Sequence, residues 1–216
     1  TNVSHDLKTP LTGIKNYLEL LNDPGLDSKT RNEYLTTLTN YTDRLNNLIQ
    51  DLFEISKANS GNIDLEPQKI NLIEFMEQVH AENMSLLEEK NLILVFEHDD
   101  EDIYCTFDPD KTVRIFENLI SNISKYTLEN TRVFVKCKKE KNYATITYKN
   151  ISKTFLDFDP EQITERFVRG DASRHESGSG LGLAIIKSFA EIQDGQFKIE
   201  IDGDVFKAIL KLPLFK

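Results

Sequence analysis

Residues 34–55 read YLTTLTNYTDRLNNLIQDLFEI, and the apolar positions in this stretch follow a coiled-coil repeat. They are separated alternately by four and three residues, which is the period of a helix that packs along a seam. The positions are Tyr34, Leu38, Tyr41, Leu45, Leu48, Leu52 and Ile55. We therefore expect one long helix here, ended by Ser60, Gly61 and Asn62.

A second apolar stripe precedes this helix and predicts a partner for it. Its positions recur at helical spacing and are Val3, Leu7, Leu11, Ile14, Leu18 and Leu21. Asn22-Asp23-Pro24-Gly25 separates the two stripes, so the pair should form an antiparallel hairpin. A lone hairpin has too little interior to shield both stripes from water. We expect a second copy of the chain to complete a four-helix bundle; the alternative is that the stripes pack on the remainder of the same chain.

Composition limits the classes of protein to which the chain can belong. Its 216 residues carry 26 Lys and Arg against 36 Asp and Glu, a formal net charge of -10, and 39% are hydrophobic. This length suits one large domain or two small ones. An acidic surface repels phosphate backbones and lipid headgroups, so neither nucleic acid nor membrane is expected as a direct partner of these residues. Cys105 and Cys137 lack a metal-site spacing, which favours two reduced thiols.

From Ile63 onward helical and strand patterns are mixed, which predicts an α+β domain. Helical patterns cover residues 72–90, 109–126 and 184–192. Strand-like patterns cover residues 92–97, 103–107, 132–139, 143–149, 196–202 and 205–212. Residues 150–179 show little periodicity. Because connections of this length are usually functional in compact domains, we expect them to form a lid over a binding site.

The sequence Ser4-His5-Asp6-Leu7-Lys8-Thr9-Pro10 places reactive side chains on the first helix. Helical geometry turns His5 away from the apolar seam, and Thr9 shares its face. Asp6 can hold an imidazole in one tautomer and balance the charge that it gains on reaction. Pro10 removes a backbone N–H and loosens the helix at this turn. An exposed His beside an Asp more often has no chemical role, so this pattern needs support elsewhere in the chain.

A glycine-rich turn supplies the first support. Gly178-Ser179-Gly180-Leu181-Gly182-Leu183 directly precedes a helical pattern. Glycines let backbone N–H groups approach phosphate oxygens, and the helix that follows presents its positive end to an anion. The GxxxxGK[ST] loop of common NTPases is absent, and no strand precedes these glycines as a dinucleotide-binding turn would require.

The helix expected at 109–126 supplies the second support. Arg114, Asn118, Asn122 and Lys125 fall on one of its faces, whereas the opposite positions are apolar. A solvated face would more typically carry Glu or Lys, because asparagine is a mediocre helix former. Two stacked carboxamides beside a cation suit Mg²⁺ and a triphosphate.

Together these motifs resemble the conserved boxes of sensor histidine kinases. Residues 5–11 resemble the H box, residues 118–126 the N box, residues 166–169 the F box and residues 178–183 the second glycine box. Their order and spacing match the family over nearly the whole chain. The resemblance implies a dimerisation and phosphoacceptor domain at residues 1–62, then an ATP-binding two-layer α/β sandwich at residues 63–216 with its lid at about 150–179.

The resemblance also implies a role for each matching residue. His5 would attack the γ-phosphate of ATP, with Asp6 steadying the imidazolium that develops and Thr9 orienting water when a phosphorylated partner is hydrolysed. Asn122 would bind Mg²⁺, and Asn118 would position the nucleotide and approach Asp6. The remaining nucleotide contacts would come from Arg114, Lys125, Tyr126, Asn150, Arg169, Gly178, Gly180, Leu181 and Gly182.

One motif departs from the family pattern. The first glycine box reads Asp-x-Gly-x-Gly in the family, whereas residues 150–154 read Asn-Ile-Ser-Lys-Thr. The family Asp accepts a hydrogen bond from the adenine amino group. Asn150 can still accept one through its carbonyl oxygen but is neutral, so weaker adenine discrimination is expected.

These features predict a homodimeric, ATP- and Mg²⁺-dependent protein-histidine kinase that passes its phosphoryl group to an aspartate on a response-regulator receiver domain. The alternative is a phosphatase-biased or ATP-sensing dimer with weak kinase activity, motivated by the altered residues 150–154 together with Thr9. The chain starts at Thr1 without a Met, so we expect a cytoplasmic fragment of a parent protein that is anchored in the membrane.

Overall fold

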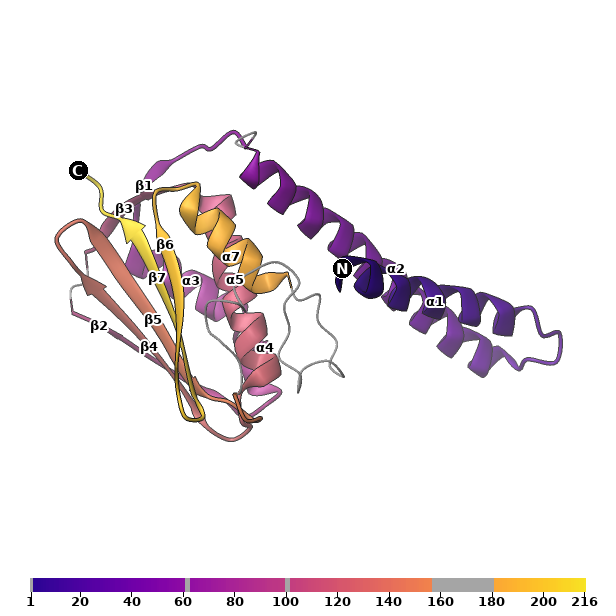
Figure 1. Cartoon of the computed structure of the whole chain (residues 1–216). Coiled ribbons are helices and arrows are strands. Elements are labelled where there is room, and N and C mark those ends of the chain that lie inside the picture. The colour runs from indigo at the N-terminus through magenta and orange to yellow at the C-terminus, as the bar shows by residue number, and fades with distance from the viewer. Residues whose placement is uncertain (1, 61–62, 100–101, 157–180) are drawn as a thin grey trace. The chain divides into compact units, whose positions relative to one another are not determined.

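The computed structural model describes residues 2–60, 63–99, 102–156 and 181–216 (Figure 1). The chain divides into two compact units, Thr1–Ser56 and Lys57–Lys216. The first unit is helical and the second combines helices with a mixed sheet, which confirms the α+β class expected from the sequence.

The helical unit is an antiparallel hairpin, as the two apolar stripes predicted. Helix α1 (Asn2–Leu21) and helix α2 (Ser28–Asn59) flank the expected turn. Asp27 caps α2, because its Oδ1 accepts hydrogen bonds from the backbone N–H groups of Lys29 and Thr30 at 2.8 and 2.9 Å. These bonds lower the pKa of the Asp27 carboxyl, because they favour its charged form.

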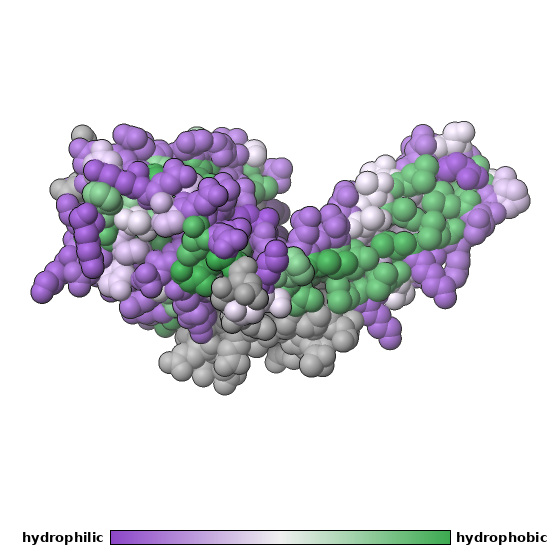
Figure 2. All heavy atoms as spheres, turned by 90° about the horizontal axis from the view of Figure 1, so that it is seen from above, coloured by the Kyte–Doolittle hydropathy of each residue, from purple (hydrophilic) through white to green (hydrophobic). Residues whose placement is uncertain are grey.

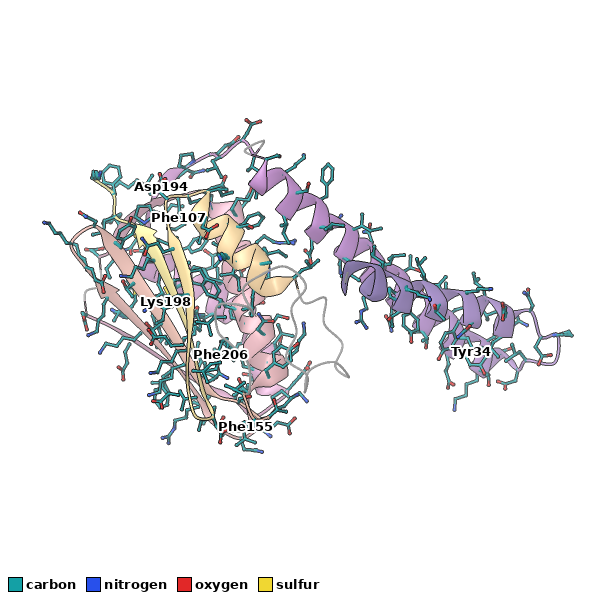
Figure 3. All side chains as sticks on the ribbon, in the orientation of Figure 1. Tyr34, Phe107, Phe155, Asp194, Lys198 and Phe206 are labelled. Atoms are coloured by element: carbon teal, nitrogen blue, oxygen red, sulfur yellow. The ribbon has the colours of Figure 1, made fainter. Side chains whose placement is uncertain are left out.

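Tyrosines and one glycine fix the spacing of the two helices. The ring of Tyr17 lies 5.4 Å from that of Tyr34, which is labelled in Figure 3, and 6.0 Å from that of Tyr41. A Cβ added to Gly13 would lie 2.8 Å from the Tyr41 ring. The helices can therefore approach this closely only because residue 13 has no side chain.

The second unit is built on a five-stranded sheet in the order β2-β4-β5-β7-β6. Strand β2 runs parallel to β4, and the other neighbours are antiparallel. The strands are β2 (Ile93–His98), β4 (Arg132–Lys139), β5 (Tyr143–Ile151), β6 (Gln196–Asp202) and β7 (Val205–Pro213). Residues alternate between buried and partly exposed along β4 and β5, which marks one face of the sheet as the core.

Helices form the second layer on the buried face of this sheet (Figure 1). They are α3 (Leu72–Glu82), α4 (Met84–Glu88), α5 (Pro109–Tyr126) and α7 (Gly182–Glu191). The helical pattern expected over residues 72–90 forms two helices, α3 and α4, because Asn83 interrupts it. Its side-chain Nδ2 donates to the Val79 carbonyl at 2.9 Å and competes with the helical backbone.

A small second sheet lies beside the main one. Strand β1 (Gln68–Asn71), which the sequence did not predict, pairs antiparallel with β3 (Tyr104–Phe107). The C-terminal residues continue this pairing, since the Phe215 N–H donates to the Tyr104 carbonyl at 2.8 Å. The ammonium of Lys69 lies 4.7 Å from the ring centre of Tyr104 and 4.5 Å from that of Phe215, so cation–π contacts hold this end of the chain.

The described residues of the second unit include a buried histidine and two buried cysteines. His80 is 5% exposed, and its Nε2 lies 2.7 Å from the hydroxyl of Tyr148 on β5. Both cysteines are buried and free, and burial raises the pKa of each thiol to about 12. Cys105 lies on β3 and Cys137 lies on β4. None of the described helices has the length and apolar character that crossing a bilayer requires.

Candidate active site

Helix α5 carries the polar face that the sequence predicted. Asp108 caps it by accepting the Lys111 N–H at 3.1 Å, and Pro109 occupies the first turn. The helix buries its apolar side, which comprises Ile115, Phe116, Leu119, Ile120 and Ile123. The opposite side carries Arg114, Asn118, Asn122 and Lys125, none of which is buried.

Helix α7 brings the last glycine of the glycine-rich turn against this polar face. A Cβ added to Gly182 would lie 3.1 Å from Asn118 Oδ1 and 3.4 Å from Asn122 Nδ2. Leu181, just before the helix, is buried and accepts the Ile185 N–H at 2.8 Å. The N-terminus of α7, the positive end of the helix dipole, therefore begins beside both asparagines.

The end of β5 is hydrogen-bonded to the end of the same helix α5. The Lys153 N–H donates to the Tyr126 carbonyl at 2.9 Å, and the Leu128 N–H donates to the Ile151 carbonyl at 2.9 Å. Thr127 and Ser152 form a β-bridge between these contacts. This pairing brings Asn150, 28 positions after Asn122 in the sequence, to the end of the sandwich that holds the polar face of α5.

Three buried polar atoms at this end lack hydrogen-bond partners among the described residues. They are Asn122 Nδ2, Thr127 Oγ1 and Asn150 Oδ1. A buried polar group without a hydrogen-bond partner lowers the stability of the fold, and in native proteins such a group commonly bonds to a ligand or to an ordered water. The site therefore offers one donor, one hydroxyl and one carbonyl acceptor to a polar ligand.

The residues present fit a nucleotide with its magnesium ion. Asn118 donates through Nδ2 to the Arg114 carbonyl at 2.8 Å, which turns Oδ1 towards Gly182. The described residues contain no cluster of three His, Cys, Asp or Glu side chains that could hold a metal by themselves. A Mg²⁺ ion here would be held by carboxamide oxygen together with ligand phosphates, because Mg²⁺ in nucleotide sites takes few ligands from the protein and the rest from phosphates and water.

Several residues expected at the site lie outside this description. The side chains of His5 and Asp6 are not described, although their backbone belongs to α1. Arg169, Gly178, Gly180, the F box and most of the expected lid fall within residues 157–180, which are also not described. Thr9 is on the exposed surface of α1. The structure thus brings together Asn118, Asn122 and Gly182, with Asn150 placed by β5.

Sequence reasoning missed Thr127. It ends α5, is 1% exposed, and its backbone N–H donates to the Ile123 carbonyl at 3.0 Å. Its position directly after the Lys125-Tyr126 pair of the N box was the available signal. Only the bridge to Ser152 shows that its hydroxyl is enclosed near Asn150.

Comparison with known proteins identifies two domains. The model of the His Kinase A (phospho-acceptor) domain matches residues 1–61. The model of the histidine kinase-, DNA gyrase B- and HSP90-like ATPase matches residues 107–215.

Curated relatives agree with these matches. Sensor protein VanSC of Enterococcus gallinarum is 33% identical over 214 residues, which is 98% of this chain and 59% of the relative. Sensor histidine kinase WalK of Bacillus subtilis (strain 168) is 31% identical over 199 residues, which is 90% of this chain and 32% of the relative. The chain thus spans 32% of the length of one of these relatives and 59% of the other.

Solved structures share the fold at lower identity. Acinetobacter baumannii histidine kinase AdeS superposes with a TM-score of 0.77 at 16% identity, over 98% of each chain. Histidine kinase ThkA in complex with the response regulator TrrA gives 0.74 at 20% identity, over 99% of this chain and 60% of that one. Full-length ShkA in complex with AMPPNP gives 0.74 at 20% identity, over 98% and 44%. The match over residues 107–215 shows that the chain belongs to the histidine kinase-, DNA gyrase B- and HSP90-like ATPase family, and its first 61 residues match the phospho-acceptor domain of histidine kinases.

Proposed function

We propose that the chain is an ATP-dependent kinase that phosphorylates its own His5 and then transfers the phosphoryl group to an aspartate of a response-regulator receiver domain. The observation that carries this proposal is the cradle of Gly182, Asn118 and Asn122, in a chain whose first helix holds His5. The relatives ShkA, which binds AMPPNP, and ThkA, which binds a response regulator, support the same pair of ligands.

The chemistry divides between the two units. The Nε2 atom of His5 attacks the γ-phosphorus of ATP, the bond to the bridging oxygen breaks, and ADP leaves. Asp6 accepts a hydrogen bond from Nδ1–H and stabilises the positive charge on the ring. The phosphates lie at the N-terminus of α7, where Gly182 leaves room for them, and Lys125 and Arg169 balance their charge. Asn122 would hold Mg²⁺, which would neutralise phosphate charge.

Other residues hold the nucleotide without reacting. Asn118 and Arg114 support the polar face of α5, and Tyr126 lies where α5 meets β5. We assign the contact with the base to Asn150 and contacts with the phosphates to the backbone of Gly178, Gly180 and Leu181. We assign phosphoacceptor and dimerisation roles to residues 1–62, nucleotide binding to residues 63–216 and a lid to residues 150–179, on the cytoplasmic side of a membrane-anchored parent.

The helical unit supports assembly as a homodimer. Several large apolar side chains on α1 and α2 remain about half exposed in the single chain, among them Leu11, Leu18, Ile49 and Phe53 at 52%, 50%, 51% and 60%. Figure 2 shows the apolar surface that runs along this unit. A surface of this kind is covered by a partner in most stable proteins, and a second hairpin would complete a four-helix bundle.

Incubation with γ-labelled ATP and Mg²⁺ tests the proposal directly. The protein should acquire label that is stable in base and labile in acid, which is the signature of phosphohistidine. His5→Gln should abolish the label, whereas His98→Gln, a substitution of the same kind in the second unit, should leave it. Label that persists in His5→Gln would contradict the proposal.

A second candidate is a phosphatase-biased dimer that chiefly dephosphorylates its regulator. The altered residues 150–154 favour it, as does Thr9 one turn after His5. In this case the wild type would transfer little phosphate, and Thr9→Ala would slow dephosphorylation of the regulator. Efficient transfer together with unchanged dephosphorylation by Thr9→Ala would exclude this candidate.

A further inference from the structure

Asn150 is a buried carboxamide at the last inward-facing position of β5. It pairs in register with Phe206 of β7, which is labelled in Figure 3, and is 5% exposed. Residues 144, 146, 148 and 150 of β5 are all buried, so strand alternation directs Asn150 to the helix-covered side of the sheet. Its side chain is therefore withdrawn from bulk water.

The carbonyl oxygen of Asn150 has no hydrogen-bond partner among the described residues. Burying an amide oxygen without a hydrogen-bond partner costs free energy, and the fold carries that cost at Asn150. Thr127 repeats the observation, because it is 1% exposed and its hydroxyl also lacks a partner. Two such groups at one end of the sandwich indicate a polar ligand rather than an isolated packing defect.

The position of Asn150 relative to the phosphate cradle suggests which part of the ligand it meets. The Lys153 N–H bonds the Tyr126 carbonyl, so the end of β5 is tied to the last turn of α5. Asn122, with its own buried amide nitrogen, lies one turn earlier on the same helix and contacts the Gly182 position. If phosphates occupy the cradle at Gly182, the base of the nucleotide is the part left for Asn150.

A carboxamide and a carboxylate can form hydrogen bonds with different purine bases. A carboxylate only accepts hydrogen bonds, so it pairs with the 6-amino group of adenine and repels the 6-oxygen of hypoxanthine or guanine. A carboxamide carries an acceptor and two donors, and a half-turn of its terminal torsion exchanges them. With the oxygen towards the base it accepts from a 6-amino group; with the nitrogen towards the base it donates to a 6-oxygen.

We propose that Asn150 gives the nucleotide site a dual base specificity, so that it binds 6-amino and 6-oxo purine nucleotides with similar affinity. This proposal rests on the proposed function, because it requires that the site bind a nucleotide. It deepens that function by naming the substrate class as purine nucleotides with either substituent at position 6.

The test compares binding of ADP, IDP and GDP, with Mg²⁺, by titration calorimetry at pH 8. These diphosphates cannot donate a phosphoryl group, so the readout is affinity and not activity. For the wild type we expect the dissociation constants of ADP and IDP to agree within about tenfold. GDP shows in addition whether the pocket admits the 2-amino group, which IDP lacks.

Three variants assign any dual specificity to the side chain of residue 150. Asn150→Asp should shift the IDP to ADP ratio by more than about tenfold in favour of ADP, because an ionised carboxylate repels the 6-oxygen. Asn150→Ala should weaken both ligands together. Asn142→Asp, the same substitution at an exposed site in the hairpin between β4 and β5, should leave the ratio unchanged. Thermal melting of each variant establishes that it is folded.

The outcomes separate this proposal from the function on which it rests. Binding of ADP with IDP weaker by more than about tenfold would overturn dual specificity and leave the proposed kinase intact. Weakening of ADP alone in Asn150→Ala would overturn it too. Failure of all three diphosphates to bind would overturn both. Should Asn150→Asp not fold, the wild-type ratio and Asn150→Ala still decide the matter.

Discussion

Gly182 lies directly against the side chain of Asn118, so that a Cβ at residue 182 would come within 3.1 Å of Asn118 Oδ1. The two residues are far apart in the sequence and lie on antiparallel helices of one layer. Their contact places the glycine-rich turn beside the polar face of α5, so that the two can bind one ligand. Substitution of Gly182 therefore tests whether this contact matters for ligand binding.

Gly182→Ala should weaken nucleotide binding while the protein remains folded. The added methyl group would press on the amides of both Asn118 and Asn122. These flexible side chains can move by a few tenths of an ångström, but they would then be displaced from the positions in which they bind the ligand. We expect ADP affinity to fall about tenfold. Gly25→Ala, which meets only the exposed Asp23 carboxylate at 3.3 Å, is the control. Equal ADP affinity in both variants would contradict the role given to Gly182.

Gly195→Ala should destabilise the second unit by contrast. A Cβ there would lie 2.5 Å from the Lys211 carbonyl oxygen and 2.9 Å from that of Ala190, and both are backbone atoms that cannot rotate away. We expect a loss of about 2–3 kcal/mol in the free energy of unfolding, measured in urea. Gly203→Asn is the comparison, because Gly203 has a φ of 59° and no atom near its Cβ position. Asparagine tolerates that conformation, so Gly203→Asn should lower the free energy of unfolding by less than Gly195→Ala does. A larger loss in Gly203→Asn than in Gly195→Ala would refute the explanation.

The His80–Tyr148 pair should make stability depend on pH below neutrality. Burial lowers the pKa of His80 from 6.5 to about 4, because the charged ring is poorly solvated among Phe96 and Tyr148. The unfolded chain therefore binds more protons between these values. Stability from this group is complete above pH 6.5 and is lost as the pH falls towards 4, by about 3 kcal/mol in all.

The His80→Phe/Tyr148→Phe double variant isolates this contribution. It removes both polar partners together and keeps the aromatic packing, so neither group is left buried without a partner. Urea unfolding of wild type and variant at pH 7.5, 6, 5 and 4.5 gives the difference at each pH. We expect the wild type to lose more stability than the variant across this range. Parallel curves would mean that His80 does not titrate as its burial implies.

The exposed apolar surface of the helical unit should control association. Leu18→Glu places a charge in the surface that a second hairpin would cover, and we expect the protein to sediment as a monomer at concentrations where the wild type is a dimer. Leu128→Glu is the matched control, because Leu128 is an apolar side chain of similar exposure on the second unit. A monomeric wild type, or dissociation by Leu128→Glu instead, would argue against a dimer through the hairpin.

The features that the sequence predicted are those that depend on neighbours along the chain. The alternating spacing from Tyr34 to Ile55 was sufficient to predict helix α2, because a helix repeats its faces within a few residues. The bounds of α5, Pro109 and Tyr126, agree with expectation because the cap at Asp108 and the apolar pattern are both local. The proposal of Asn118, Asn122 and Gly182 as site residues came from local motifs in the same way.

Other features depend on contacts between segments that are far apart in the sequence. Strand β1 has no apolar pattern of its own and exists because β3, more than thirty residues later, pairs with it. The burial of His80 depends on Tyr148, 68 positions away, and nothing near His80 in the sequence indicates that partner. Likewise, the enclosure of Thr127 and the unpaired oxygen of Asn150 arise where the end of β5 bonds to the end of α5. Local periodicity therefore determined the elements and the motif residues, whereas tertiary packing decided which polar groups lie buried without a partner, because burial is a property of the surroundings and not of the residue.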